Sequence, residues 1–280
     1  PGEEGREINV DSSVRAIVDY LENDWTDGEN SLELPVQVTK PEGSAEDLAY
    51  VKDLLGSFTT SFSTSGADRS KNVNSGAKHV NGTVLYPGET FSMYETVAPF
   101  TAENGYAMAG SYLNGEVVDS MGGGICQVST TLYNAVLRAE LEVVERSPHS
   151  MTVHYVELSE DAAIAGTYKD FKFKNSTEYP IYIEGYTTSD KKITFNIYGK
   201  ETRDSNRSIS FESVLVNEVK PNTILRDDAG QGLGYKSVSA GKTGYVAELY
   251  KIVKVNGVQT DRIKINKSTY KGSDRVVTYG

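Results

Sequence analysis

Cysteine is almost absent from this sequence, since Cys126 is the only one among 280 residues. A single thiol excludes an internal disulfide, so the fold must be held by packing. No stretch approaches the roughly 18 apolar residues that a membrane-spanning helix needs. Dense Lys/Arg runs are also missing, and the net charge is −11. That balance argues against a nucleic-acid partner, because nucleic acid requires a basic face.

Composition and hydrophobic pattern divide the chain into three parts. Residues 1–43 have the helix and strand patterns expected at the end of a domain. Residues 44–200 combine helix patterns with a meander of short alternating strands, and a polar break then leads into residues 201–280, whose long alternating runs are punctuated by glycine. We therefore predict an α+β protein, with a central domain of helices on an antiparallel sheet and a following elongated all-β domain.

Apolar spacing and turn residues predict the individual elements of the central part. Ser44 with Asp47 resembles a capping box, so we expect a helix over 44–56. The other expected elements are helices over 72–80 and 126–140, and strands over 58–62, 83–86, 142–146, 151–156, 170–174, 181–186 and 193–198.

The cysteine follows three glycines, in the segment from Met121 to Tyr133. Because the glycines lead into a helix pattern, the thiol lies at the first helical turn. Amide dipoles at a helix start favour a thiolate, and a glycine turn leaves amide hydrogens uncovered, as an oxyanion site requires. These features predict Cys126 as a nucleophile, with Gly123 and Gly124 as oxyanion donors. The alternative is a small core residue, because buried cysteine packs well.

A cysteine nucleophile needs a base within hydrogen-bond reach and a third group that orients the base. In a strand over 151–156, successive side chains point to opposite faces. Only one of His149 and His154 can therefore face the cysteine helix. His149 shares its face with Met151 and Val153, which favours His149 as the base.

Two aspartates are candidates for the group that orients the imidazole. If the chain turns at Ser159 and Glu160 as a simple hairpin, Asp170 lies opposite His149 and Asp161 lies in the turn. The order of cysteine helix, histidine strand and aspartate is similar to that of transglutaminase-like cysteine enzymes. This similarity of order does not by itself assign a function.

Gln127, beside the cysteine, and Arg146 are candidates for binding a substrate carboxylate. Each could equally form a surface ion pair or a cap. No metal site is expected, because one cysteine and two histidines at irregular spacing supply too few ligands on one face. No motif indicates a cofactor.

Around this cysteine the sequence resembles the VanW family, which is named for an accessory protein of the B-type vancomycin-resistance cluster. The resemblance spans roughly residues 58–200. It rests on blocks in the same order as in the family: 81–92 (NGTVLYPGETFS), 122–135 (GGGICQVSTTLYNA), 145–150 (ERSPHS) with 161–163 (DAA), and 169–175 (KDFKFKN). The resemblance implies a family context without a particular reaction.

The flanking parts carry resemblances of their own. Residues 237–280 are similar to the five-glycine domain of bacterial surface proteins, for which a role in N-acetylglucosamine binding has been proposed. Residues 1–43 look like the tail of a peptidoglycan-binding domain that often precedes VanW. These resemblances imply an extracellular protein, associated with the wall or membrane of a Gram-positive-type bacterium. The polar start at Pro1 leaves a signal peptide or membrane anchor upstream open.

Two functions follow from these observations. One is a wall-associated protein in a VanW-like accessory role, which binds peptidoglycan or a related envelope glycan or peptide. The other is a cysteine-dependent amidase, peptidase or transpeptidase-like enzyme, in which Cys126 attacks a wall peptide and His149 takes the thiol proton. The reactivity of the thiol in the folded protein distinguishes the two.

Overall fold

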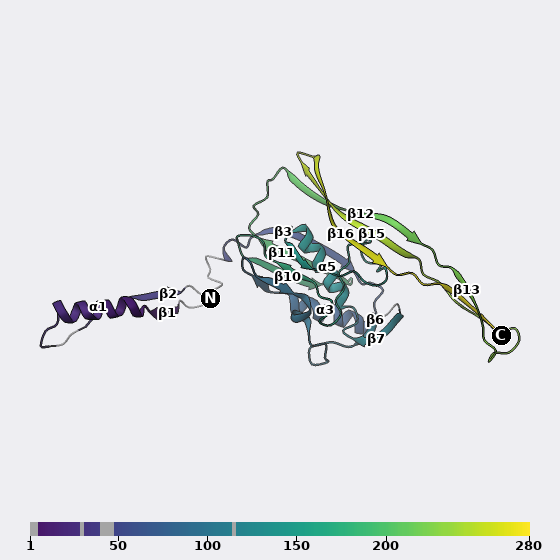
Figure 1. The fold of residues 1–280 in the computed structure, drawn as a ribbon, viewed down its shortest axis with the longest axis horizontal. Helices are drawn as coiled ribbons and strands as arrows, with labels where there is room; N and C mark the ends of the chain where they lie inside the picture. Colours follow the sequence, from purple (N-terminus) through teal and green to yellow (C-terminus); the bar gives the residue numbers. More distant parts are fainter. Residues whose placement is uncertain (1–4, 29–30, 40–47, 114–115) are drawn as a thin grey trace. The chain divides into compact units, whose positions relative to one another are not determined.

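The computed structural model describes residues 5–28, 31–39, 48–113 and 116–280. The chain forms two compact units, Pro1–Tyr50 and Val51–Gly280, and each is described by itself (Figure 1). The predicted α+β class is confirmed, with antiparallel pairing in nearly all of the sheets. Among the described residues, no helix has the length and apolar character needed to cross a membrane.

The first unit pairs a short hairpin-like sheet with one helix. Strand β1 (Gly5–Ile8) is antiparallel to β2 (Val36–Thr39), and helix α1 (Val10–Asn23) lies between them in sequence. The Asn9 side chain caps this helix by accepting a hydrogen bond from the Ser12 amide at 3.0 Å, which satisfies one of the free amides at the helix start. The predicted boundary at residue 43 lies outside the described residues.

The second unit is built around a four-stranded antiparallel sheet in the order β3-β11-β10-β4. Its strands are β3 (Asp53–Ser61), β4 (Thr83–Leu85), β10 (Ile181–Thr187) and β11 (Lys192–Gly199). The strands predicted over 58–62, 83–86, 181–186 and 193–198 are thus confirmed as parts of one sheet.

The helix predicted over 44–56 is wrong from residue 53 onward, where β3 begins and pairs with β11. Residues 44–47 lie outside the described residues. A Cβ atom at Gly56 would stand 2.4 Å from the Ala139 amide nitrogen, so the strand lies directly against the end of a helix. This tertiary contact overrides the local helix pattern.

Helices α3 (Ala67–Val80) and α5 (Ile125–Arg138) pack against each other and against this sheet. Helix α3 begins five residues before the predicted start at residue 72, whereas α5 confirms the helix predicted over 126–140. The core that they share with the sheet contains these fully buried side chains: Val73, Val80, Val128, Leu132, Val136, Ile181, Ile183, Ile193, Phe195 and Ile197. Such burial, at about 25 cal/mol per Å² of apolar surface, fixes the position of α5.

Smaller elements surround the two ends of α5. A three-stranded sheet in the order β5-β9-β8 joins β5 (Thr90–Ser92), β9 (Lys172–Lys174) and β8 (Glu142–Glu145). Helix α4 (Met93–Val97) follows β5. Strands β6 (Met108–Leu113) and β7 (Glu116–Met121) form an antiparallel hairpin that leads into the glycine turn before α5.

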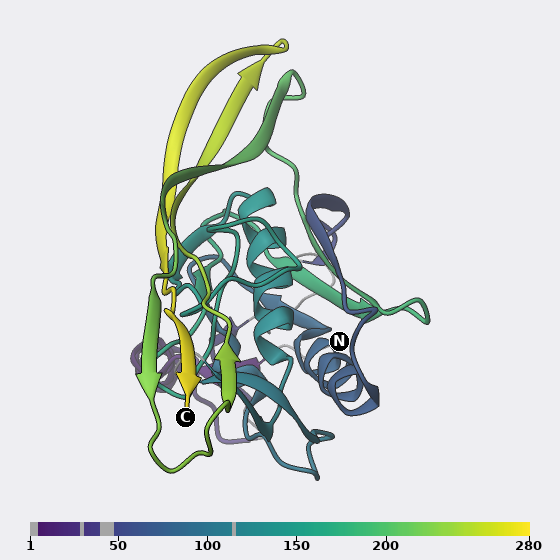
Figure 2. The same ribbon diagram turned by 90° about the vertical axis from the view of Figure 1, so that its right-hand side faces the viewer.

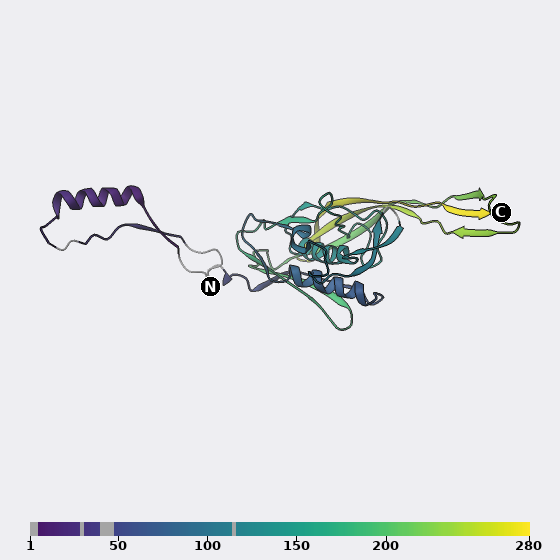
Figure 3. The same cartoon turned by 90° about the horizontal axis from the view of Figure 1, so that it is seen from below.

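Long strands make up the C-terminal part of the second unit. The antiparallel sheet β12-β15-β16 consists of β12 (Arg207–Val219), β15 (Gly244–Val255) and β16 (Val258–Tyr270), and its strands extend beyond the helices (Figure 2). A second sheet, in the order β13-β17-β14, contains β13 (Thr223–Asp227), β17 (Arg275–Tyr279) and β14 (Lys236–Ser239). It reaches away from the helices toward the C-terminus (Figure 3).

The long strands share the core and the charges of the helix domain. Leu249 of β15 belongs to the same hydrophobic cluster as α5. Glu140, just after α5, forms ion pairs with Arg207 and with Lys251, the latter at 2.8 Å. These bonds hold the pKa of Glu140 down at about 2, although burial alone would raise it. Residues on both sides of the predicted boundary at 200–201 therefore pack together, and that boundary stays a prediction.

Candidate functional site

The glycine turn before α5 places Cys126 at the start of the helix. Gly122 and Gly124 have φ angles of +79° and +110°, which side chains with a Cβ rarely adopt. At Gly123 a Cβ would lie 2.2 Å from the Ala109 carbonyl oxygen, so this residue passes directly against β6. The three glycines are thus required by the geometry of the turn itself.

Some of the amides in this turn already have partners. The Gly123 amide donates to the Ser120 carbonyl at 3.3 Å, and the Ile125 amide donates to the Gly122 carbonyl at 3.1 Å. For the amides of Gly124 and Cys126, no acceptor is found among the described residues. Of the two predicted oxyanion donors, Gly124 therefore has an uncommitted N–H group and Gly123 does not.

His149 is bound to Asp161 through both its ring and its backbone. The His149 ring nitrogen Nδ1 lies 2.7 Å from Asp161 Oδ2, and the His149 backbone amide donates to the same oxygen at 2.6 Å. Both residues are buried, with 6% of His149 and 0% of Asp161 exposed. The imidazole is thus held from two directions by one carboxylate.

The expected strand over 151–156 is wrong, because this segment is irregular. Instead, Ser147 and Ala163 form an isolated antiparallel bridge. In an antiparallel register, two residues after Ser147 lie opposite two residues before Ala163. His149 is therefore expected opposite Asp161, in agreement with their hydrogen bond. The chain therefore reverses several residues before Ser159, and the hairpin that would have placed Asp170 opposite His149 does not form. His154 is exposed.

Asp170 has partners of a different kind. Its carboxylate accepts hydrogen bonds from Ser92 Oγ at 2.6 Å and from the amides of Tyr94 and Phe171 at 2.8 and 2.7 Å. Lys172 approaches it only to 3.9 Å. Asp170 therefore holds the start of α4, and no hydrogen bond connects it with His149 among the described residues.

Asp161 also receives donors from Arg146 and from the C-terminal strands. Arg146 donates to Asp161 Oδ1 at 3.0 Å, and its Nε donates to the Asp161 carbonyl at 2.6 Å. The hydroxyl of Tyr270, at the end of β16, donates to Asp161 Oδ1 at 2.5 Å. Arg146 in turn donates to Ser268 Oγ of β16 at 2.9 Å. The aspartate that holds the imidazole is therefore fixed by residues distant in sequence.

The electrostatics of the three side chains favour a charged pair. Burial alone would raise the pKa of Cys126, but the neighbouring His149 lowers it below its usual value. Burial would lower the pKa of His149, but hydrogen bonds with Asp161 and Cys126 raise it to about 9. The pKa of Asp161 is lowered, since His149 and Arg146 outweigh its burial. These shifts favour a thiolate beside an imidazolium.

Neither predicted carboxylate-binding residue points freely into solvent. The Gln127 amide nitrogen donates to Thr60 Oγ1 at 3.0 Å and to the Ser61 carbonyl at 2.9 Å, and its oxygen accepts a hydrogen bond from Arg69. Arg146 is committed to Asp161 and β16, as described above. Gln127 thus fixes α5 to β3, and Arg146 supports Asp161.

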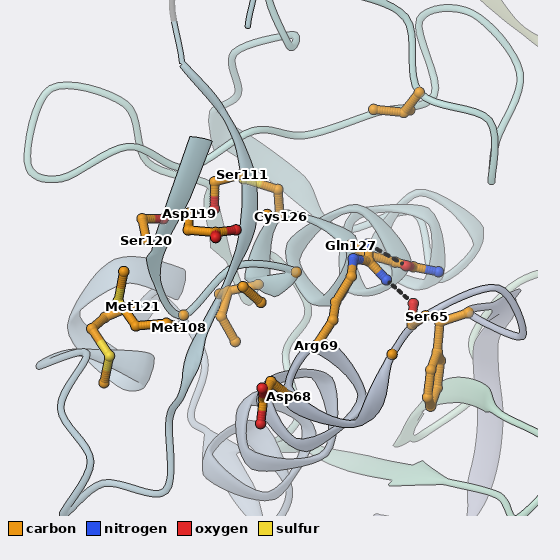
Figure 4. Close-up of a pocket in the computed structure, with 18 of the residues that line it drawn as sticks. Ser65, Asp68, Arg69, Met108, Ser111, Asp119, Ser120, Met121, Cys126 and Gln127 are labelled. Carbon is orange, nitrogen blue, oxygen red and sulfur yellow. Dashed lines mark hydrogen bonds between the residues drawn. The ribbon is translucent and has the colours of Figure 1, made fainter. Parts of the chain in front are cut away.

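A cleft of about 1190 Å³ opens beside this site, and Cys126 and His149 line it. Its walls come from the β3–α3 segment, the β6–β7 hairpin, the start of α5 and the segment around residues 153–166. Figure 4 shows Arg69 extending toward Gln127 and Ser65, with Ser111 and Asp119 of the hairpin on another side of the cleft. Cys126 is half-buried, and its sulfur also contacts the Ile164 carbonyl oxygen at 3.4 Å.

The sequence interpretation did not identify Arg69, Tyr155 or Tyr270 as members of the site. Arg69 and Tyr155 line the cleft. Burial is the largest cause that raises the pKa of Tyr155; the charge of Cys126 raises this pKa further, and the charge of Arg69 lowers it. No local motif marks these positions, because each reaches the site from a different part of the fold. Among the described residues, no three His, Cys, Asp or Glu side chains are grouped so that they could hold a metal ion.

The solved structures that match part of the chain include two G5 domains. A G5 domain of IgA1 protease matches 26% of this chain and 90% of its own length, at 21% identity and a TM-score of 0.22. A second structure, HP0197-G5, matches 27% of this chain and 100% of its own length, at 22% identity and a TM-score of 0.18.

Sequence relatives match the chain at higher identity than these structures. The uncharacterized protein YoaR of Bacillus subtilis (strain 168) is 35% identical over 184 residues, which are 65% of this chain and 60% of YoaR. The vancomycin B-type resistance protein VanW of Enterococcus faecalis (strain ATCC 700802 / V583) is 31% identical over 134 residues, or 45% of this chain and 48% of that protein. The chain thus spans about half to three fifths of the length of these relatives.

The family described as VanW like protein matches residues 68–198. This range contains the glycine turn, Cys126, His149 and Asp161, together with α3, α5 and most of the central sheet. Residues 68–198 are therefore similar to the VanW-like family, and the chain resembles YoaR and VanW over part of their length.

Proposed function

We propose that this protein is a cysteine-dependent acyl-transfer enzyme that acts on an amide of a cell-envelope peptide. The observation that carries the proposal is that Cys126 and His149 line the same open cleft, with Asp161 bound to the His149 ring behind it. A cysteine that served only as a core residue would need neither a charged imidazole nor a buried carboxylate behind that imidazole.

The reaction follows from the protonation states of these groups. The Cys126 thiolate attacks the carbonyl carbon of the substrate amide, and a C–S bond forms. His149, protonated in the resting pair, gives its proton to the leaving nitrogen as the C–N bond breaks. An acceptor, water or an amine, then loses a proton to His149 and attacks the thioester, so that the C–S bond breaks and the thiolate is restored. Water gives hydrolysis, and an amine gives transpeptidation.

The oxyanion of the tetrahedral intermediate needs donors that are free before the substrate arrives. The amides of Gly124 and Cys126 meet this requirement, because neither has an acceptor among the described residues. The amides of Gly123 and Ile125 do not meet it, because both donate hydrogen bonds within the turn. The helix dipole of α5 adds positive potential at the same place. We assign the oxyanion role to these two amides.

The substrate class and the location are inferred from the family. One relative is named for vancomycin resistance, and the resemblances of both flanks imply an exported protein at the wall or membrane. A peptidoglycan stem peptide is therefore the proposed substrate, and peptidoglycan or another envelope glycan or peptide is the proposed partner. We also propose the division into residues 1–43, 44–200 and 201–280, with the outer parts as binding regions in a VanW-like accessory role.

Thiol reactivity is the direct test. The folded protein is treated with iodoacetamide from pH 4 to 10, and alkylation of Cys126 is followed by intact mass. We expect the rate to rise at a pH well below the ordinary cysteine pKa of about 8.5. A thiol that stays unreactive until the protein is denatured contradicts catalysis and leaves the non-catalytic envelope-binding role.

The product is sought in a second experiment. Purified peptidoglycan is incubated with the wild-type chain or with Cys126→Ala, then digested and analysed by mass spectrometry. We expect an altered stem peptide, trimmed or newly cross-linked, with the wild type alone. Sedimentation with the wall should be equal for both proteins, which separates binding from chemistry. Identical digests with a reactive thiol would contradict the proposed substrate class.

A further inference from the structure

Arg69 is a cation in the cleft wall, and no described carboxylate neutralises its charge. It lies in the first turn of α3 and is half-buried. No carboxylate among the described residues forms an ion pair with it. Two carboxylates do line the cleft, Asp68 and Asp119, but Figure 4 shows both of them apart from the guanidinium group.

The guanidinium is nevertheless held in place. An arginine has five N–H donors. One on Nη1 donates to Ser65 Oγ at 2.6 Å, and one on Nη2 donates to Gln127 Oε1 at 2.9 Å. Both acceptors are neutral and belong to buried residues. No described residue accepts a hydrogen bond from the other three N–H groups. Neutral partners therefore position the guanidinium, and three of its N–H groups are available to a ligand.

This fork lies next to the proposed nucleophile. A Cβ atom at Gly124 would stand 3.0 Å from Arg69 Cγ and 3.5 Å from Arg69 Nε, so the side chain runs along the glycine turn. Gln127, which Arg69 contacts directly, follows Cys126 in the chain. The charges of Arg69 and Cys126 also both affect the pKa of Tyr155. The cation and the sulfur therefore border the same part of the cleft.

We propose that Arg69 forms a carboxylate-binding subsite beside Cys126, so that the peptide substrate carries a free carboxylate close to the amide that is attacked. This inference rests on the proposed function for its substrate, but not for the binding of the anion. A planar carboxylate matches the fork geometry of a guanidinium. The ligand would supply the negative charge that the described residues do not place beside Arg69, which favours anionic over neutral peptides.

Charge selectivity of alkylation tests the subsite without knowledge of the substrate. Iodoacetate carries a carboxylate, whereas iodoacetamide is neutral and of similar size. The readout is the rate constant for alkylation of Cys126 by iodoacetate divided by that for iodoacetamide. In the wild type we expect this ratio to be higher than in the Arg69→Gln variant. Arg69→Gln should lower this ratio roughly 10-fold, because a nearby charge acts strongly in a partly desolvated cleft. Arg69→Lys should retain part of the preference.

Lys71→Gln is the matched control. Lys71 is exposed on the same helix and does not line the cleft, so its removal changes the net charge by the same amount and should leave the ratio unchanged. An equal loss in both variants would indicate a general charge effect and overturn the subsite. A reactive Cys126 whose ratio does not respond to Arg69→Gln also overturns it, while the proposed function stands.

A binding measurement keeps the subsite testable even if the thiol is unreactive. The Nε–H signal of Arg69 in the wild-type chain is followed by NMR during titration with N-acetylalanine, and then with N-acetylalaninamide. We expect a saturable shift with the acid and a much smaller one with the amide. Equal responses, or none, overturn the subsite. Failure of alkylation with a selective NMR shift would instead overturn catalysis alone.

Discussion

Two buried aspartates, Asp161 and Asp170, differ in what surrounds them although both carboxylates are almost fully enclosed, with 0% and 3% of their surface exposed. Asp170 takes its close hydrogen bonds from a serine hydroxyl and two backbone amides. Such neutral donors do not titrate, so this carboxylate can only fix the chain around α4.

Asp161 instead faces groups that carry charge. Arg146 and His149 both bind its oxygens, and Tyr270 donates a further hydrogen bond. A carboxylate next to a titratable imidazole changes the charge of that imidazole, because it favours the protonated form. The comparison teaches that the donor set, and not burial, distinguishes a structural aspartate from one that acts on a neighbouring base.

The largest effect is expected from Asp161→Asn compared with Asp170→Asn. Without the Asp161 carboxylate, burial favours a neutral His149, and the thiolate of Cys126 loses its charged partner. Asp161 also raises the pKa of Cys126 directly, but this is the smallest of the causes there. We expect alkylation at pH 7 to slow roughly 10- to 100-fold, since a hydrogen bond to a charged group contributes about 1.5–3 kcal/mol.

Asp170→Asn serves as the control in the same assay. It should lower the melting temperature, because Asp170 holds buried backbone amides, and leave the rate of alkylation unchanged. Both rates are measured with iodoacetamide on folded protein, and circular dichroism verifies the fold. Equal slowing in the two variants would mean that the difference between the aspartates has no bearing on the thiol.

The pH dependence of alkylation sharpens the same comparison. With the pKa of Cys126 lowered and that of His149 raised to about 9, the charged pair persists between the two values. The rate should therefore rise below pH 8.5, reach a plateau and change again near pH 9, where the imidazolium loses its proton. Asp161→Asn should shift the first step upward and remove the second. A single step near the ordinary cysteine pKa in the wild type would contradict the charged pair.

A smaller effect is expected from Tyr270→Phe. This change leaves the contact between Asp161 and His149 in place, so alkylation should change only a few-fold. Stability should fall by about 1–3 kcal/mol, because the buried Ser159 amide loses the hydroxyl that accepts its hydrogen bond at 2.7 Å. Tyr250→Phe removes a hydroxyl that contacts Glu248 on the same sheet and is the control. If Tyr270→Phe slows alkylation as much as Asp161→Asn, the strand β16 belongs to the reactive site itself.

The smallest effect is expected in the pH dependence of the free energy of unfolding. A raised pKa at His149 stabilises the folded state below 6.5, and this contribution declines as the pH rises toward about 9. A lowered pKa at Cys126 stabilises the folded state above 9.0, and this contribution declines as the pH falls. Between these values the folded pair and the unfolded pair each hold one proton, so the two slopes cancel.

Urea unfolding at pH 7.0, 7.5 and 8.5 measures this cancellation, as the difference between the wild type and a double variant, Cys126→Ala with His149→Gln, because Cys126→Ala alone leaves the titrating His149 in place. We expect a difference that is nearly independent of pH. A slope near 1.4 kcal/mol per pH unit would mean that only one member of the pair has a shifted pKa, and it would contradict the charged pair.

Much of the fold could be predicted because its signals are local. Glycine followed by apolar residues at helical spacing located α5, and alternation located the strands of the central sheet. The helix over 44–56 was wrong from residue 53 onward and the strand over 151–156 was wrong, since contacts distant in sequence decide both segments. At Gly56 a close approach to α5 requires an extended chain, and after Pro148 the backbone is held by Asp161 through the His149 amide.

The candidate site was predictable only in its outline. Cys126 and His149 could be named from residue type and order, and their catalytic role stays a prediction. The choice between Asp161 and Asp170 depended on where the chain reverses, which no turn motif marked. Arg69 and Tyr270 approach from a helix and a strand far away in sequence, and a single sequence contains no local signal of such approaches.

The packing of α5 has a practical consequence for anyone who isolates the part that relatives share. That part ends at residue 198, yet Tyr133, Glu140 and Asp161 each bind side chains that come after residue 206. A chain that ends at residue 198 would lack Leu249, so the core residues that Leu249 covers would be exposed to water. It would also leave Glu140 without Lys251 as its ion-pair partner. The shortest stretch worth expressing is Val51–Gly280.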